Sequence, residues 1–327
     1  MLVVERKQTD PYFNLAAEEY FLKAFDEDIF MLWRNEPSVI IGKHQNIQKE
    51  VHPSLIAKPM LPIIRRITGG GTVYHDLGNV NFTFINNGKA NKLVSFPKYL
   101  NTILSALNAL GLDAYMGANN NLLINDHKIS GNAAHVFKNR VIHHGTLLFE
   151  SKLDQLNFAI TGNNKNYIDK AIESKRMKVT NIARHLPHKM NVLEFMAFIK
   201  AHIFSLHPQA KTYSLTNNDI AEIERIKENR YLKHNWNFHY SPPFRFKKET
   251  ESNDQVYNLE VFVKSGLIKE FALHKNSKHH YLHKMFSELL IGKNFYTTKY
   301  ANILKNLRHQ LSSEDFHAFH QLIISKQ

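Results

Sequence analysis

The spacing of apolar and polar residues predicts several helices in the first two thirds of the chain. Asp10-Pro11 suits a helix start, because aspartate caps the first turn and proline is tolerated at its first position; this helix is expected to run to about Phe25. A second helix is expected over Phe96 to Leu110, closed by Gly111. Its apolar stripe consists of Leu100, Ile103, Leu104, Leu107 and Leu110. Further helices are expected over 153–160, 191–204 and 219–229.

Short β-type runs lie between these helices. Residues 29–33, 39–41 and 122–124 are apolar and bounded by turn formers, and a hairpin is expected to carry 141–142 and 146–149 on its return strand. Because strands and helices do not alternate regularly, the predicted fold class is α+β: a mixed, largely antiparallel sheet with packed helices.

The last third of the chain predicts a small second domain. Pro242-Pro243 marks a boundary, and the polar stretch 245–255 is interpreted as a surface linker. Residues 257–263 and 267–273 then form a predicted hairpin, followed by three helices, the last opened by Ser312 with Asp315 three residues later. We therefore expect a first, larger domain over 1–244, a linker over 245–255 and a small α+β domain over 256–327; the family resemblance described below makes them a catalytic and an accessory domain.

Composition removes several function classes. The chain has 327 residues and no cysteine, which excludes disulfides, thiolate zinc sites, iron–sulfur clusters and cysteine acyl-enzymes. No apolar run approaches the roughly 20 residues that span a bilayer, and the N-terminus has no signal-peptide pattern, so we expect a cytoplasmic protein without a membrane partner. The net charge of +13 favours an acidic partner. Because the excess is spread along the chain, a non-catalytic nucleic-acid-binding protein is only a remote alternative.

The stretch 65–79, Arg-Arg-Ile-Thr-Gly-Gly-Gly-Thr-Val-Tyr-His-Asp-Leu-Gly-Asn, is the first that suggests chemistry. Three consecutive glycines let a loop present backbone N–H groups to an anion, and the two arginines before them add charge. The stretch fits neither G-x-x-x-x-G-K-[ST] nor G-x-G-x-x-G, so P-loop and Rossmann interpretations fail. The alternative is a glycine turn flanked by solvated arginines.

Two more clusters follow, Lys-Ile-Ser-Gly-Asn-Ala at 128–133 and His-His-Gly-Thr-Leu-Leu at 143–148. Together with the glycine stretch they resemble the lipoate–protein ligase A family, as do Asn-Leu-Ala-Ala-Glu-Glu at 14–19 and Val-Thr-Asn-Ile at 179–182. The resemblance covers roughly residues 10–245, with the motifs in the family's order. Octanoyltransferases of the same superfamily work through a cysteine that this chain lacks, and biotin ligases carry a different Gly-Arg-rich loop.

The resemblance implies a biotin/lipoate ligase-like catalytic domain and a two-step reaction. Such ligases activate lipoate with ATP to lipoyl-AMP, release pyrophosphate, and transfer the lipoyl group to one lysine of an acceptor protein. ATP is then a co-substrate and Mg²⁺ is expected, without a bound prosthetic group. The implied partners are lipoate, lipoyl domains of 2-oxoacid dehydrogenases and the glycine-cleavage H protein, and not nucleic acid; we expect a monomer.

The resemblance also assigns the site residues. Lys128 is the catalytic residue, an electrostatic clamp that touches both the phosphate and the lipoyl carbonyl. The implied ATP- and adenylate-binding residues are Arg66, Gly71, Thr72, Val73, Tyr74, Asn79, Asn120, Asn121, Lys128, Arg176 and Thr180. The implied lipoate-binding residues are Gly70, Gly71, Lys128, Ser130, Gly131, Ala133, His144 and Gly145.

One departure from the family leaves a second function open. Asn121 stands where the family has an aspartate, which is a natural Mg²⁺ ligand. No metal-binding residue is therefore assigned to this chain. The alternative is a lipoyltransferase that uses preformed lipoyl-AMP and adenylates lipoate weakly or not at all. Residues 174–178 resemble the family's adenylate-binding loop, which is expected to close over the nucleotide. His279 and His283 have helical spacing for a zinc pair, but solvated histidines are the expectation.

Overall fold

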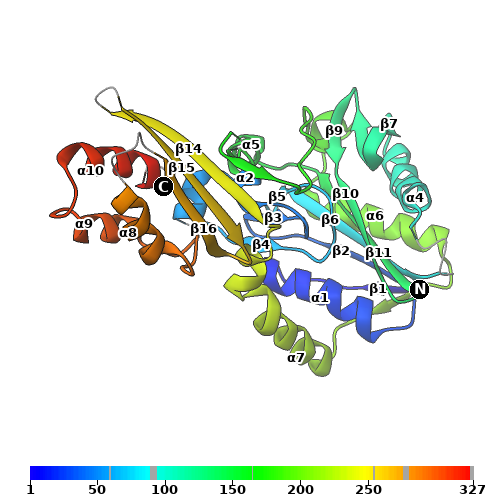
Figure 1. Ribbon diagram of the computed structural model, residues 1–327. Coiled ribbons are helices and arrows are strands. Elements are labelled where there is room, and N and C mark those ends of the chain that lie inside the picture. The colour runs from blue at the N-terminus through cyan, green and yellow to red at the C-terminus, as the bar shows by residue number, and fades with distance from the viewer. Residues whose placement is uncertain (59, 89–93, 164, 253–254, 275–279, 325–327) are drawn as a thin grey trace. The chain divides into compact units, whose positions relative to one another are not determined.

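The computed structural model describes residues 1–58, 60–88, 94–163, 165–252, 255–274 and 280–324 (Figure 1). The chain divides into two compact units. The first consists of Met1–Lys43, Leu61–Ile160 and Ser174–Lys233, and the second of His44–Met60, Thr161–Glu173 and His234–Gln327. Within the described ranges, no helix combines the length and apolarity needed to cross a membrane.

The first unit is built on a six-stranded mixed sheet. Its strands, in spatial order, are β10 (Asn132–Phe137), β11 (Arg140–Leu148), β6 (Asn79–Asn87), β2 (Ile29–Trp33), β1 (Leu2–Val4) and β13 (Lys211–Tyr213). The pairs from β10 to β2 are antiparallel, whereas β1 pairs in parallel with both β2 and β13. The predicted α+β class with a mixed, largely antiparallel sheet is confirmed.

Within the described residues, two three-stranded sheets and five α-helices complete this unit, together with the short 3₁₀ or π helices η1 (Ala118–Asn120), η2 (Ile182–His185) and η3 (Lys227–Tyr231). One sheet has the order β4 (Ile63–Arg65), β3 (Ser38–Ile41), β5 (Val73–His75), and the other the order β7 (Ala114–Met116), β8 (Leu122–Ile124), β9 (His127–Ser130). The helices are α1 (Pro11–Ala24), α4 (Phe96–Ala109), α5 (Leu153–Ala159), α6 (Val192–Leu206) and α7 (Asn217–Ile226). The predicted start of α1 is confirmed, since the Asp10 side chain accepts a hydrogen bond from the Tyr12 N–H.

The main core lies between one face of the six-stranded sheet and the helices α4 and α6. Phe30, Phe82 and Phe84 project from β2 and β6 into this core, where the predicted stripe of α4 meets them. Leu100, Ile103 and Leu107 of that stripe are buried, and Gly111 closes the helix at φ +80° as expected. The opposite face of the sheet carries polar side chains, which α1 covers with Glu18.

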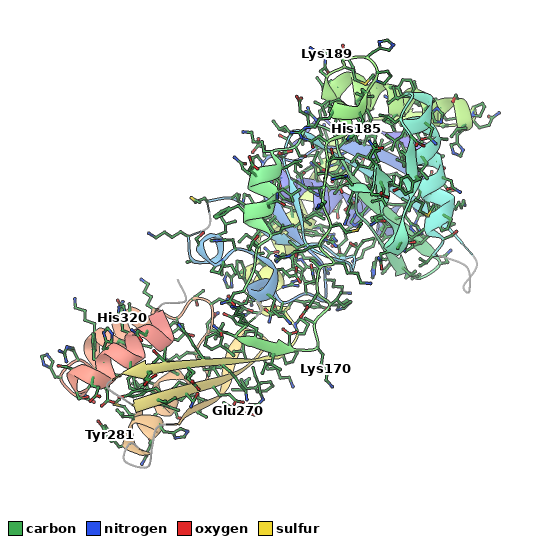
Figure 2. The ribbon with its side chains drawn as sticks, turned by 90° about the horizontal axis from the view of Figure 1, so that it is seen from above. Lys170, His185, Lys189, Glu270, Tyr281 and His320 are labelled. Atoms are coloured by element: carbon green, nitrogen blue, oxygen red, sulfur yellow. The ribbon has the colours of Figure 1, made fainter. Side chains whose placement is uncertain are left out.

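The second unit is an antiparallel sheet packed against helices. The sheet order is β12 (Tyr167–Asp169), β14 (Phe244–Ser252), β15 (Gln255–Lys264), β16 (Leu267–His274), and the helices are α2 (Ile47–Glu50), α3 (Pro53–Ala57), α8 (His280–Leu290), α9 (Tyr300–Asn306) and α10 (Ser313–Phe319). Figure 2 shows Glu270 on the strand layer and His320 on the helical layer of this unit. The predicted cap of α10 is confirmed, because Ser312 Oγ accepts a hydrogen bond from the Asp315 N–H at 3.0 Å.

The predicted linker over 245–255 is wrong, because this stretch forms β14 and the start of β15. Phe244 and Phe246 are buried, while Arg245 and Lys247, which alternate with them along the strand, lie on the opposite face of the sheet. There Arg245 and Lys247 form ion pairs of 2.9 Å with Glu260 on the neighbouring strand. The cross-strand ion pairs explain why a charged sequence forms a strand here.

The second unit also includes three segments that the sequence assigned to the first domain: 44–60, 161–173 and 234–244. Residues 44–60 and 161–173 join it through a buried polar cluster, in which Asp169 accepts hydrogen bonds from Asn46 Nδ2 at 2.8 Å and from Lys49 Nζ at 3.5 Å. Such long-range pairing leaves no local sequence signal. The assignment of catalytic and accessory functions to 1–244 and 256–327 stays a prediction.

A buried aspartate of α7, Asp219, connects this helix to α1 and β13 through hydrogen bonds. Asp219, 4% exposed, accepts hydrogen bonds of 2.7 Å from the hydroxyl groups of Tyr20 and Tyr213, and of 2.8 Å from the Thr216 backbone and hydroxyl groups. Burial alone raises the pKa of this carboxyl, but the hydrogen bonds outweigh burial and lower it. The ionised form therefore stabilises the fold.

We predict that Asp219→Asn lowers the free energy of unfolding at pH 7 by about 1–3 kcal/mol, because a charged acceptor of several hydrogen bonds is lost. The contribution of Asp219 should be complete above its ordinary pKa of about 4 and should disappear as the pH falls through the lowered value. Urea unfolding at pH 7 and below pH 4 measures both effects. Asp113→Asn, at an exposed position, is the control and should change stability by less than about 0.5 kcal/mol.

Candidate active site

The glycine-rich loop connects β4 to β5 and is shaped by Arg66. The guanidinium of Arg66, 5% exposed, donates to Thr68 Oγ1 at 2.8 Å and to the carbonyl oxygens of Gly69 and Gly71 at 2.5 and 2.7 Å. Its third nitrogen donates to the Ile40 carbonyl oxygen at 3.1 Å. Burial lowers the pKa of Arg66 to about 10, so the group stays charged at neutral pH. Arg66 thus holds the loop in place while supplying a buried positive charge.

Lys128 brings a second cation to the site. It lies on β9, and its Nζ rests against Gly131, where an added Cβ would lie 3.2 Å from the ammonium. Within the described part of the chain, no acceptor lies within hydrogen-bonding distance of this half-buried ammonium. Burial lowers the pKa of Lys128. A partly desolvated ammonium without a counter-charge is well suited to receive an anion.

The segment 174–180 connects the glycine-rich loop to Lys128. Ser174 Oγ accepts a hydrogen bond from the Thr72 N–H at 2.9 Å. Further along, the Lys178 carbonyl oxygen accepts from the Lys128 N–H at 2.8 Å, and the Thr180 N–H donates to the Lys128 carbonyl oxygen at 3.1 Å. The segment that was expected to close over a nucleotide therefore lies against both cation-bearing parts of the site.

Three asparagines lie close to Lys128 in the sequence and the fold. Asn120 and Asn121 come directly before β8, and Asn132 begins β10. Asn132 Nδ2 donates to the Asn120 carbonyl oxygen at 2.7 Å, and Asn121 Nδ2 donates to Met177 Sδ at 2.9 Å. Asn121 Oδ1 is buried without a partner in the described residues. No group of three or more His, Asp or Glu side chains within the described residues can hold a metal ion, and His279 lies outside them. Asn121 therefore fits only as one neutral oxygen ligand of a cation that substrate phosphates also bind.

A buried chain of hydrogen bonds links Arg66 to α1. Thr68 Oγ1 lies 2.8 Å from His144 Nε2, and His144 Nδ1 lies 2.9 Å from Glu18 Oε1. Glu18 Oε1 also accepts from Thr83 Oγ1 at 2.6 Å. An ionised carboxylate only accepts, so His144 carries its proton on Nδ1 and, when neutral, receives a hydrogen bond from Thr68 on Nε2. This chain holds His144 on the polar face of the sheet.

The structure gathers part of the predicted set and places the rest further out. The residues at or beside the loop and Lys128 are Arg66, Gly70, Gly71, Thr72, Asn120, Asn121, Lys128, Ser130, Gly131, Ala133, His144, Gly145 and Thr180. Tyr74 is buried, with its hydroxyl donating to Gln155 Oε1 at 2.7 Å, and Val73 precedes it on β5. Arg176 is exposed and donates to the Ile160 carbonyl oxygen. Asn79 is buried in β6 with Oδ1 unpartnered in the described residues.

Sequence reasoning missed four polar side chains that shape this site. They are Glu18, Thr68, Asn132 and Ser174. Ser174 was signalled only by the basic segment around it, and Asn132 by the small residues beside Lys128. Glu18 lies on a helix, where a carboxylate is normally taken as solvated. Its burial becomes visible only when strands β6 and β11 bring Thr83 and His144 to it.

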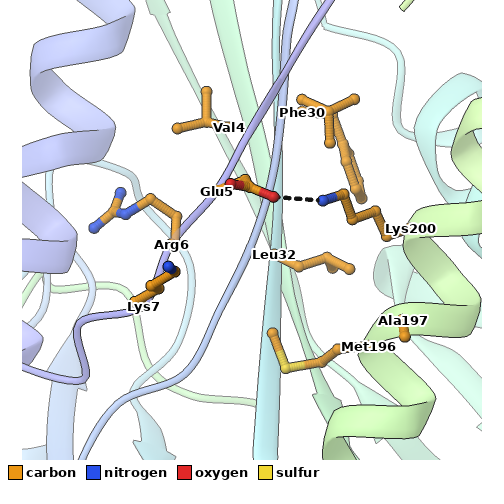
Figure 3. A pocket seen from close by; sticks show the side chains of 10 residues that line it. Val4, Glu5, Arg6, Lys7, Phe30, Leu32, Met196, Ala197 and Lys200 are labelled. Carbon is orange, nitrogen blue, oxygen red and sulfur yellow. Dashed lines mark hydrogen bonds and ion pairs between the residues drawn. The ribbon is translucent and has the colours of Figure 1, made fainter. Parts of the chain in front are cut away.

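A separate surface pocket does not coincide with this site. It has a volume of about 200 Å³ and lies between β1, β2 and α6, with Phe30, Leu32 and Met196 among its lining residues and the Glu5–Lys200 ion pair of 2.9 Å across it (Figure 3). It contains none of the predicted site residues. Leu32 and Phe82 belong to the main core, and Leu32 also borders this pocket.

Comparison with known proteins identifies the family of this chain. Residues 10–204 match the family described as lipoyl protein ligase A/B catalytic domain. The chain is 33% identical over 326 residues to the lipoate-protein ligase LplJ of Bacillus subtilis, covering 97% of this chain and 98% of that protein. It is 37% identical over 263 residues to lipoate–protein ligase 1 of Staphylococcus aureus, covering 80% of each. The chain therefore belongs to the lipoyl protein ligase A/B family.

A solved structure confirms the fold. P. falciparum LipL1, determined in complex with lipoate, is 24% identical, with a TM-score of 0.64 over 94% of this chain and 98% of that one. The biotin/lipoate ligase fold that the motifs implied is thus confirmed.

We predict that Gly70→Ala lowers kcat/KM for the nucleotide by about tenfold or more. Gly70 has φ +81°, where an L-residue costs about 1–2 kcal/mol. Its added Cβ would also lie 3.1 Å from Arg66 Nη2. The matched control is Gly69→Ala, since nothing lies within 4 Å of that added Cβ. Equal nucleotide kinetics for the two variants would contradict the proposed importance of the loop's shape.

Proposed function

We propose that the protein is an ATP-dependent lipoate–protein ligase, which forms lipoyl-AMP and transfers the lipoyl group to a lysine of an acceptor lipoyl domain. The observation that carries this proposal is the Lys128 ammonium, which has no acceptor among the described residues. The segment 174–180 connects it to the glycine-rich loop that Arg66 holds in place. Family membership supports the same reaction.

The first step must bring two anions together. A lipoate carboxylate oxygen attacks the α-phosphorus of ATP, a P–O bond forms, and pyrophosphate leaves with the electrons of the bond that breaks. Unit charges 4 Å apart repel by about 4 kcal/mol at an effective dielectric of 20. In the proposal, Lys128, the charge of Arg66 and the N–H groups of Gly71 and Thr72 offset this repulsion and the charge that grows on the phosphate.

The second step needs no nucleophile from the protein. The uncharged amine of the acceptor lysine attacks the acyl carbon, an amide bond forms, and AMP leaves while the nitrogen loses a proton. Lys128 stabilises the developing negative charge on the acyl oxygen and is not itself acylated. A Mg²⁺ ion bound with ATP would neutralise phosphate charge, and Asn121 Oδ1 is the buried oxygen that this chain would offer to it.

Ser174 has to move during the reaction cycle. Its hydroxyl occupies the Thr72 N–H, one of the donors assigned to the nucleotide. A phosphate oxygen that binds this N–H must displace Ser174, so nucleotide binding and rearrangement of the segment 174–180 are coupled in the proposal. The sequence predicted that this segment closes over the nucleotide. In the proposal, Ser174 must first release the Thr72 N–H.

The expected acceptors are acidic lipoyl domains, including those of 2-oxoacid dehydrogenases and the glycine-cleavage H protein. The net charge of +13 would raise the association rate with such partners at low salt. Incubation with lipoate, Mg-ATP and a lipoyl domain, followed by mass measurement of the acceptor, tests the proposal. The acceptor mass should rise by one lipoyl group only when ATP is present; an unchanged mass with a competent acceptor would contradict it.

Asn121 supports one alternative, a lipoyltransferase that accepts preformed lipoyl-AMP. An amide oxygen binds Mg²⁺ more weakly than the carboxylate it replaces. Pyrophosphate release from lipoate and Mg-ATP without acceptor separates the two functions. A ligase releases pyrophosphate under these conditions, whereas a transferase does not but still transfers the lipoyl group from added lipoyl-AMP.

We predict that Lys128→Ala lowers the rate of lipoyl-AMP formation by about 100-fold or more, because a charge that stabilises the transition state is removed. Lys138→Ala, an exposed lysine in the turn between β10 and β11, is the control and should retain the full rate. Adenylate formation by Lys128→Ala at the rate of the unmodified protein would contradict the assigned role.

We also predict a decline of kcat/KM at alkaline pH. The active form carries the Lys128 ammonium, and burial lowers its pKa. The ammonium is therefore lost as the pH rises through a value below the ordinary pKa of about 10.4. A pH profile of pyrophosphate release measures this decline, and an activity that stays constant beyond pH 10.4 would contradict it.

A further inference from the structure

A chain of side-chain amides leads from α1 to His75, outside the contacts used so far. Asn14 Nδ2 donates to the carbonyl oxygens of Gln8 at 3.1 Å and Arg34 at 2.9 Å. Carbonyl oxygens only accept, so the orientation of the Asn14 amide is determined. The same nitrogen lies 2.8 Å from Asn35 Oδ1, so its two hydrogens are shared among three acceptors. Because an amide nitrogen accepts no hydrogen bond, Asn35 turns Oδ1 and not Nδ2 toward it. The Asn14 amide therefore also determines the orientation of Asn35.

The orientation of Asn35 decides the tautomer of His75. With Oδ1 facing Asn14, Asn35 presents its Nδ2 to His75 Nδ1 at 3.0 Å. An amide nitrogen only donates, so His75 Nδ1 accepts and carries no proton. In the neutral imidazole the proton is therefore on Nε2. Main-chain carbonyl groups thus select one tautomer of His75 through two asparagines.

The Nε2–H group of His75 has no acceptor in the described residues. His75 is 3% exposed, and its Nε2 is buried. An unpartnered buried donor costs about 1–3 kcal/mol, so such a group calls for an explanation. His75 lies on β5, three residues after Thr72 of the glycine-rich loop. Its ring meets the Trp33 ring edge-on with centroids 5.9 Å apart.

His75 also stays uncharged at physiological pH. Burial, followed by the nearby positive charge of Arg66 and the His144 imidazole, lowers the pKa of His75 to about 3. The group cannot act as a proton carrier near neutrality or as a counter-charge for an anion. It can donate one hydrogen bond from Nε2, in surroundings that contain Trp33, Arg66 and His144.

We propose that His75 Nε2–H donates a hydrogen bond to an acceptor atom of the bound acid substrate, and that Asn14 and Asn35 are positioning residues that hold the imidazole in this tautomer. The inference rests on the proposed function, because that function supplies the acid. The acid satisfies the buried donor on binding, which makes the contact part of substrate affinity and not of nucleotide affinity.

Two substitutions of His75 distinguish the effect of losing the Nε2–H donor from the effect of losing the imidazole ring. Glutamine can place its amide nitrogen near the position of His Nε2, whereas the shorter asparagine reaches only the position of Nδ1. His75→Asn should raise KM for lipoate about tenfold, or about 1.4 kcal/mol, and leave KM for ATP within about twofold. His75→Gln should recover most of the lipoate affinity. Equal values of KM for lipoate in both variants and the unmodified protein would overturn the contact.

Asn35→Asp tests the positioning role without altering His75. A carboxylate only accepts, so it would draw the His75 proton to Nδ1 and leave Nε2 unable to donate. KM for lipoate should rise about as much as in His75→Asn. Asn101→Asp, at an exposed position of α4, is the matched control and should not change it.

Nitrogen NMR of ¹⁵N-histidine-labelled unmodified protein supplies a measurement that needs no variant to fold. The imidazole resonances missing in His75→Asn identify His75, and they should show the Nε2–H tautomer and shift when lipoate alone is added. Calorimetry on the same sample reports lipoate binding independently. Binding with unmoved His75 resonances, as expected if a buried water satisfies Nε2, would overturn this inference alone; absence of lipoate binding would overturn the proposed function as well.

Discussion

The repulsion between a carboxylate and a triphosphate is the constraint on which the structure of this site depends. An enzyme that joins two anions must hold positive charge where both can meet it, and must keep that charge from being neutralised by its own carboxylates. Arg66 and Lys128 meet this need differently. The guanidinium donates to the carbonyl oxygens of its own loop, whereas the Lys128 ammonium is left without an acceptor in the described residues. One cation builds the site, and the other is available to substrate.

The same constraint explains why so many polar groups are buried beside the glycine-rich loop. Burying an isolated charge is costly, but here Glu18 accepts hydrogen bonds from Thr83 and His144, which connects through Thr68 to Arg66. These links tie the loop to α1 and to the polar face of the six-stranded sheet. A second set of links, through Asn14 and Asn35, ends at His75. Both sets begin on α1, which is therefore a support for the site as well as a packing element.

Local patterns predicted the fold well wherever an element carries its own signal. The Asp10-Pro11 start of α1, the stripe of α4 and the Ser312 cap of α10 depend on residues a few positions apart, and all are confirmed. The interpretation of 245–255 as a linker failed because the charged side of β14 is stabilised by Glu260, which lies on the neighbouring strand β15. The sequence also failed to group residues 44–60 with 161–173. The contact between Asp169 and Asn46 joins residues more than a hundred positions apart.

The candidate site likewise combines features that the sequence predicts with features that only the structure shows. Motifs identified Arg66, the glycines and Lys128, because their chemistry is evident from residue type and spacing. Sequence could not show that Ser174 occupies the Thr72 N–H, or that two asparagines determine the tautomer of His75, because these relations arise only from the packed structure. A crystal structure with bound lipoyl-AMP tests the central claim most directly. We expect Lys128 Nζ within about 3 Å of both a phosphate oxygen and the acyl carbonyl oxygen. An adenylate bound with Lys128 still turned away from both oxygens, or seated in the pocket between β1, β2 and α6, would contradict it.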